Sequence, residues 1–139
     1  MNERFEIATQ LTDEMMGPDF TAAMRAAATS GGFGSVMARL SMEQAFGDIW
    51  MRDGLDRKTR SVVVIAVLIA QGQPSELKNH VRFGLNNGLT ARELEELLLQ
   101  AVPYVGWPAV ATATSAVVEV LRERGIDLQA RTPEENGVL

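Results

Sequence analysis

Apolar residues recur at helical spacing along most of the chain. In residues 91–105 the leucines at positions 94, 97 and 98 form one apolar stripe. Thr90 precedes this stretch and Glu93 follows three residues later, which is the pattern of a capping box. The pattern predicts a helix that begins just after Thr90. Pro103 lacks an amide donor, so we expect it to kink this helix or to end it early.

The most apolar stretch of the chain lies in residues 57–71, for which we predict a helix with Asp56 as its N-cap. From Val62 to Ala70 no residue is charged, so a helix here would be apolar on every face. We therefore expect a central, fully buried helix. The β-branched run at 62–65 is also compatible with a buried strand, but the length of the stretch and the lack of a partner strand favour the helix.

Proline and glycine mark the ends of two further predicted helices. Pro74 suits the first turn of a helix that ends at Asn86-Asn87-Gly88, where asparagine and glycine accept a left-handed conformation. Pro108 likewise suits the first turn of a helix over residues 108–124, which Gly125 closes.

These elements predict an all-α protein with a helical hairpin at its centre. Residues 19–29 and 34–50 look helical, and the glycine-rich residues 30–34 separate them. We expect a single domain over residues 1–139, which consists of a helical arm at 1–45, a core at 46–125 and a polar tail at 126–139. The tail is expected to be loose or to lie on a neighbouring subunit.

The composition excludes several kinds of function. The 139 residues include 13 basic and 18 acidic side chains, and the net charge of −5 argues against binding to nucleic acid. There is no cysteine, so disulfides, thiolate nucleophiles and thiolate metal sites are excluded. One histidine cannot form a multi-histidine metal site within one chain. The longest apolar run, Val62–Ala70, is too short to span a bilayer core of about 30 Å. The charged N-terminal residues do not resemble a secretory signal, so we expect a cytoplasmic protein.

The single histidine, His80, follows Glu76 by four residues in the predicted helix that begins at Pro74. At this spacing the two side chains meet on one helix face. The carboxylate is expected to favour the protonated imidazole and to raise its pKa, so that the pair can deliver or accept a proton. A pair at this spacing also arises by chance on solvated helix faces, and the pair alone does not decide between the two readings.

Three basic residues lie at the start of the predicted helix 57–71, where the helix dipole disfavours cations. We expect Arg57 and Lys58 to face solvent or to pair with nearby aspartates. Arg60 lies just before the apolar run and is expected to be partly buried, where a guanidinium needs a carboxylate or an anionic ligand. Ser61 is a weaker polar candidate for contact with the same ligand.

Two aromatic residues near the end of the predicted helix 91–105 are candidates for ligand contact. Tyr104 and Trp107 flank Gly106 and precede Pro108, and this composition is typical of an irregular turn that lines a pocket. Packing in the core or in an interface between subunits is the alternative for both rings.

The segment from Phe46 to about Leu121 resembles the carboxymuconolactone decarboxylase family, which is related to the alkylhydroperoxidases. Four ordered motifs carry the resemblance: IWMRDGLDRKTRS, ELKNHVR, NNGLT and LLQAVPYVGWP. The alkylhydroperoxidase branch has a Cys-x-x-Cys before its histidine, and Gln73 and Glu76 occupy those positions here. The chain is therefore similar to the decarboxylase branch, in which a glutamate stands four residues before the histidine.

This resemblance implies an alkylhydroperoxidase-like helical fold that assembles into homo-oligomers, as trimers or hexamers. It implies that His80, Glu76 and Arg60 are the catalytic residues. His80 would deliver a proton while Glu76 holds and charges it, and Arg60 would bind a carboxylate or an oxyanion. Ser61, Tyr104 and Trp107 would contact the substrate. The YVGWP run departs from the YCGVP or YAGFP of other members, and Trp107 is expected to reshape the pocket.

The resemblance also implies a reaction, the cofactor-free decarboxylation of 4-carboxymuconolactone or a similar carboxylated lactone in aromatic (protocatechuate/3-oxoadipate) catabolism. No metal is needed, because the substrate delocalises the developing charge onto its own carbonyl. The expected partners are a small-molecule carboxylate and further copies of the chain, with no nucleic acid and no membrane. One alternative is the same fold acting on another small organic acid through an enolate. A second alternative is an oligomer that binds a small anion without turning it over.

Overall fold

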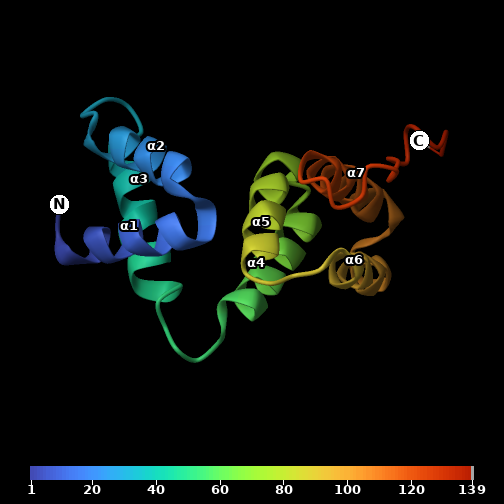
Figure 1. Ribbon diagram of the computed structural model, residues 1–139, viewed down its shortest axis with the longest axis horizontal. Coiled ribbons are helices and arrows are strands. Elements are labelled where there is room, and N and C mark those ends of the chain that lie inside the picture. Colours follow the sequence, from blue (N-terminus) through green and yellow to red (C-terminus); the bar gives the residue numbers. More distant parts are fainter. Residues whose placement is uncertain (139) are drawn as a thin grey trace. The chain divides into compact units, whose positions relative to one another are not determined.

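The computed structural model describes residues 1–138, and every regular element in this range is a helix. The all-α prediction is therefore confirmed. The chain divides into two compact units, Met1–Asp56 and Arg57–Leu139 (Figure 1). This division falls within the segment 46–125 that we predicted as one core, and the single-domain organisation stays a prediction. Within residues 1–138, every helix is too short or too polar to cross a lipid bilayer.

The first unit contains three α-helices and one π-helix, which are α1 (Glu3–Met16), α2 (Pro18–Thr29), α3 (Ser35–Leu40) and η1 (Ser41–Ile49). The predicted helix at 34–50 is thus helical, but its second half takes the wider π form. Helix α1 packs against η1 at Gly47, where an added Cβ atom would lie 2.5 Å from the carbonyl oxygen of Arg4. The lack of a side chain at Gly47 therefore permits the close contact between the two helices.

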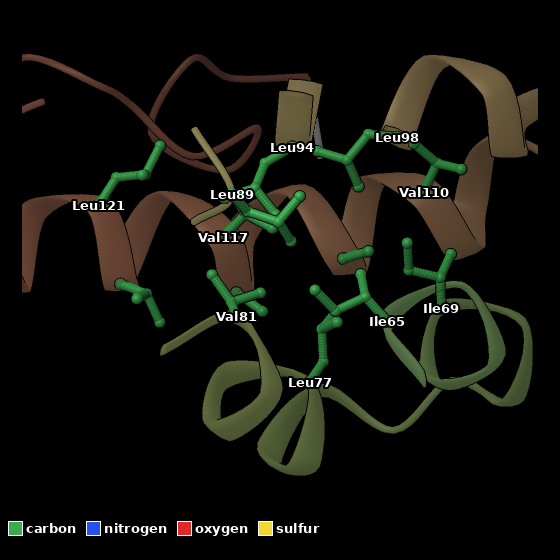
Figure 2. Close-up of a cluster of buried hydrophobic side chains, with 13 residues drawn as sticks. Ile65, Ile69, Leu77, Val81, Leu89, Leu94, Leu98, Val110, Val117 and Leu121 are labelled. Atoms are coloured by element: carbon green, nitrogen blue, oxygen red, sulfur yellow. The ribbon is translucent and has the colours of Figure 1, made fainter. Parts of the chain in front are cut away.

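The second unit contains the four helices that carry all the candidate site residues. They are α4 (Arg57–Gln71), α5 (Pro74–Asn86), α6 (Ala91–Val105) and α7 (Trp107–Glu123). Apolar side chains from all four helices meet in one buried cluster, to which α4 contributes Ile65 and Ile69, and α5 contributes Leu77 and Val81 (Figure 2). This shared core holds α4 and α5 side by side as the predicted helical hairpin.

The predicted helix ends are largely confirmed. The Thr90 hydroxyl accepts a hydrogen bond from the Glu93 amide at 3.1 Å, and the Glu93 carboxylate accepts one from the Thr90 amide at 3.1 Å. Gly88 has a φ of +103° and Gly125 a φ of +67°, the left-handed region that suits glycine. An early end at Pro103 is wrong, because α6 continues to Val105, and the alternative of a kink at Pro103 stays a prediction. Pro103 lies in the last turn, where only the end of the hydrogen-bond ladder is affected.

The prediction that α4 is fully buried is wrong. Ser61, Ile65 and Ile69 form its buried face, whereas Val63 and Val67 are 50% and 46% exposed. The other helices of this unit cover only one face of α4. The apolar residues on the other faces therefore lack a covering element within this unit.

The described part of the tail folds back onto α7 of its own chain, so the expectation of a loose segment is wrong, and contact with a neighbouring subunit stays a prediction. Arg122 of α7 pairs with Glu135 at 2.5 Å, and Ser115 donates a hydrogen bond to Glu134 at 2.8 Å. Hydrogen bonds from the guanidinium of Arg122 and from Thr132 lower the pKa of the Glu135 carboxyl to about 2. The tail is therefore held by charge-assisted contacts that the sequence pattern did not reveal.

Candidate active site

A close contact between α4 and α5 sets the geometry of the candidate site. Ser61 on α4 is fully buried, and its hydroxyl oxygen accepts a hydrogen bond from the side-chain amide of Asn87 at 3.0 Å. Gly84 on α5 lies beside this bond, since an added Cβ atom would stand 3.6 Å from the Cβ of Ser61 and 3.2 Å from Ile65. The two helices can approach at this point because position 84 has no side chain.

His80 lies one helical turn before Gly84 and belongs to a row of side chains along α5. Glu76, His80, Phe83 and Asn87 follow one another at intervals of four, three and four residues, which places them on one helix face. The ring of Phe83 contacts the imidazole of His80 edge-on, with 5.2 Å between centroids and 81° between planes. Phe83 is buried and His80 is partly buried. The Nδ1 atom of His80 is buried and has no hydrogen-bond partner among the described residues.

The expected rise in the pKa of His80 is wrong. Burial lowers the pKa of His80 below its ordinary 6.5, and the negative charge of Glu76 acts in the opposite direction without reversing the shift. Glu76 is solvent-exposed, so water screens its charge, and no hydrogen bond joins it to His80 in the described part of the chain. The imidazole is therefore mostly neutral near pH 7 when the site is empty.

The basic residues at the start of α4 differ in their surroundings. Arg60 is partly buried, as predicted, and is the residue next to the buried Ser61. Ser61 lies beside Gly84 of α5, and Gly84 follows His80 by one helical turn. Since Arg60 is adjacent to Ser61, it is displaced from His80 by roughly 6 Å or more along the axis of the hairpin. Lys58 pairs with Glu93 on α6 at 2.8 Å, a partner that differs from the solvent or the nearby aspartates that we expected.

The structure places Tyr104 and Trp107 in two different hollows. Gly106, with a φ of +89°, both ends α6 and begins α7, which turns the two rings apart. Tyr104 is 81% exposed at a groove of about 710 Å³ between α4 and α6, which Val62 and Ala66 also line. Trp107 is 72% exposed at a pocket of about 430 Å³ between α7 and the tail. His80 and Arg60 line neither hollow.

The six residues predicted for the site are therefore only partly brought together. Glu76 and His80 share a face of α5, and Arg60 lies on the neighbouring helix α4, where its contact with the other two residues stays a prediction. Ser61 accepts a hydrogen bond from Asn87 and has no exposed surface in this chain. Its contact with a substrate stays a prediction. Direct substrate contacts by Tyr104 and Trp107 stay predictions as well.

Sequence reasoning missed three residues that build the site. The spacing of Phe83 from His80 places it on the same helix face, which could have identified it as a neighbour of the imidazole. Asn87 was interpreted only as a helix end, although its side chain binds Ser61. The close packing at Gly84 depends on tertiary contacts with Leu89 and Ile65 that no local pattern records.

Comparison with known proteins identifies relatives for most of the chain. A profile of the carboxymuconolactone decarboxylase family matches residues 35–119. Over 82 residues the chain is 48% identical to 4-carboxymuconolactone decarboxylase of Acinetobacter baylyi, and this aligned segment covers 59% of this chain and 61% of that protein. Over 95 residues it is 35% identical to nitrosuccinic acid decarboxylase of Metarhizium robertsii, and this second aligned segment covers 68% of this chain and 66% of that protein. The matches span slightly less than two thirds of the length of these relatives.

The opposing effects of burial and Glu76 on His80 predict how a charge substitution acts. Glu76→Gln removes the negative charge that favours the imidazolium, so the pKa of His80 should fall further below its wild-type value. Because His80 is the only histidine, a pH titration of its ring protons by NMR reports this pKa without assignment ambiguity. Glu95→Gln, an exposed change on α6, should leave the pKa unchanged. An identical pKa in wild type and Glu76→Gln would show that Glu76 does not act on the imidazole.

Proposed function

The chain belongs to the carboxymuconolactone decarboxylase family, and we propose that it is a cofactor-independent carboxy-lyase. The proposed reaction is the decarboxylation of 4-carboxymuconolactone, or of a similar carboxylated lactone, to an enol-lactone in aromatic catabolism. The choice of substrate is supported by the 48% identity to a relative that is named 4-carboxymuconolactone decarboxylase. The observation that carries the proposal for this chain is the half-buried His80, whose Nδ1 atom has no partner and whose pKa is lowered by burial.

The substrate itself supplies the electron sink for this reaction. Its leaving carboxylate sits on a carbon vinylogous to the lactone carbonyl, so loss of carbon dioxide places the electron pair in a dienolate. The protein must bind the anionic substrate, stabilise the developing oxyanion and return a proton to the ring carbon α to the carbonyl. Preorganised charges and a positioned general acid meet these needs, and a general acid contributes roughly 10²–10⁴-fold in rate.

We assign the role of proton donor to His80. In this proposal, substrate binding produces the protonated imidazole that donates the proton. The empty site holds a neutral imidazole because burial outweighs Glu76. A bound carboxylate adds a second negative charge beside the ring, which raises its pKa and favours uptake of a proton from solvent. The imidazolium then donates a proton to the dienolate and returns to the neutral form as product leaves.

Arg60 is the proposed binding group for a substrate carboxylate or for the oxyanion. It lies next to Ser61, whose bond to Asn87 ties the start of α4 to the end of α5. A guanidinium that is partly buried here can form two parallel hydrogen bonds to a carboxylate. Arg60 would therefore hold the substrate while His80 performs the proton transfer.

The alkylhydroperoxidase-like fold, the trimer or hexamer, and a cytoplasmic location belong to the same proposal. The exposed Val63 and Val67 on α4 support an oligomer in which other copies cover this face. In such an oligomer, residues from a neighbouring copy would complete the wall of the site. Tyr104 and Trp107 are the proposed substrate contacts that assembly would supply.

The relative from Metarhizium robertsii favours a second candidate substrate, nitrosuccinate. In nitrosuccinate one carboxylate is attached to the carbon that carries the nitro group, so its loss places charge on a nitronate. The needs of this reaction are the same, namely an anion site and a proton donor to carbon. The two candidates therefore differ in the shape of the substrate and not in the roles of His80 and Arg60.

A direct assay tests the proposed reaction. Purified protein incubated with 4-carboxymuconolactone should release carbon dioxide and form an enol-lactone, which ultraviolet absorbance and proton NMR detect. Nitrosuccinate in a parallel assay distinguishes the second candidate. Turnover of neither compound would overturn the proposed activity, even if one of them binds.

Substitutions separate the proposed roles of the two residues. His80→Ala should lower kcat roughly 10²–10⁴-fold because the general acid is lost. Arg60→Ala should mainly raise KM for the dianionic substrate, because it removes a carboxylate-binding group. Arg57→Ala removes an equal charge from the exposed first residue of α4 and should have little effect on either constant. Wild-type kinetics in His80→Ala would remove histidine from the mechanism, and wild-type KM in Arg60→Ala would remove the anion site.

A further inference from the structure

Phe83 is the one described aromatic ring in direct contact with the imidazole, and the geometry of α5 explains why. Side chains on an α-helix lean toward its N-terminus, so Phe83 reaches back over the turn that carries His80. The two rings meet nearly at right angles, with 5.2 Å between their centroids. Edge-to-face contacts of this kind favour one ring orientation over others. Phe83 is 5% exposed and therefore has little freedom to move away.

The burial of Nδ1 determines which nitrogen of His80 is available for chemistry. Nδ1 is inaccessible to solvent and has no partner in residues 1–138, although the residue as a whole is partly exposed. In a neutral imidazole one nitrogen carries the proton and the other accepts hydrogen bonds. A buried N–H with no acceptor is costly, so the proton is favoured on the nitrogen that can reach water or a ligand. That nitrogen is Nε2.

We propose that Phe83 is a positioning residue that fixes the His80 ring with Nδ1 buried and unprotonated, so that Nε2–H is the group presented to the substrate. This inference rests on the proposed function, because it assigns the atom of His80 that would exchange a proton with the dienolate. In the empty site Nε2–H is a hydrogen-bond donor to a substrate carboxylate or carbonyl. The proton taken up when substrate binds goes to Nδ1, and the burial of Nδ1 without a partner is the reason that this uptake is disfavoured before an anion binds. In the imidazolium both nitrogens carry a proton, and Nε2–H transfers its proton to carbon. The ring is then left as the Nδ1–H form, which returns to Nε2–H by proton exchange with solvent after the product leaves.

Charged groups lie on α5 and on the two helices packed against it, α4 and α7, and must be considered in any pH measurement. Glu76 lies on α5 itself, and its charge raises the pKa of His80. On α4, the basic residues near the site end of the hairpin are Arg57, Lys58 and Arg60. The facing charges of α7 are neutralised by pairing with α5, since Glu119 binds Lys78 and Glu123 binds Arg82. Glu76 is therefore the charge to keep constant when position 83 is changed.

NMR of the single histidine tests the inference without any substrate. In wild type near neutral pH, the ¹⁵N shifts should show an unprotonated Nδ1 and a protonated Nε2. Phe83→Leu keeps an apolar side chain but removes the ring, so the ring-current shift of the His80 protons should disappear. Phe83→Ala admits water to Nδ1, so the pKa of His80 should rise toward 6.5. Leu98→Ala, a change in the core of the same unit, controls for a general loss of packing and should leave the His80 spectrum unchanged.

Kinetics of the same variants test the link to catalysis. Phe83→Leu should lower kcat about tenfold with little change in KM, because the proton donor is misplaced while the anion site is intact. The acidic limb of the pH profile of kcat/KM should move with the pKa measured by NMR. A protonated Nδ1, or a wild-type histidine spectrum in Phe83→Leu, would overturn the inference. If the wild-type protein turns over neither proposed substrate, the proposed function fails, while the NMR result still decides whether Phe83 positions His80.

Discussion

The close approach of α4 and α5 at Gly84 is the constraint on which the site depends. An added Cβ atom at this position would stand 2.7 Å from the end of the Leu89 side chain and 3.2 Å from the end of Ile65, so glycine lets the hairpin close without displacing either side chain. The bond from Asn87 to Ser61 lies at the same point and satisfies a hydroxyl that is otherwise fully buried. These contacts fix the axial register of the two helices. The register in turn places Arg60 of α4 and His80 of α5 on neighbouring turns.

The electrostatic state of His80 follows from how this hairpin buries it. Packing against Phe83 removes water from the imidazole and disfavours its charged form. Glu76 opposes this effect from the solvent-exposed side of the same helix and is too weak to cancel it. The pKa of this imidazole therefore responds to any further charge that comes close to the ring. An anionic substrate is such a charge, so binding and protonation are coupled in the proposed mechanism.

The sequence predicted the elements of the second unit well because their signals are local. The Thr90–Glu93 capping box and the glycines at 88 and 125 each depend on residues within one or two turns. The sign of the pKa shift at His80 was mispredicted because Glu76 is visible in the sequence, whereas burial by tertiary packing is not. The exposed face of α4 and the docking of the tail on α7 were missed for the same reason. An apolar run does not say which of its faces are covered, and the bond of Glu135 to Arg122 joins segments that no periodic pattern connects.

The coupling of proton uptake to anion binding is the central claim, and calorimetry measures it most directly. A non-reactive dicarboxylate of the substrate's size is titrated into the protein near neutral pH, in buffers of different ionisation enthalpy. The dependence of the measured heat on the buffer gives the number of protons taken up. We predict an uptake that approaches about one proton per site in the wild type and none in His80→Gln. Binding without proton uptake in the wild type would contradict the account.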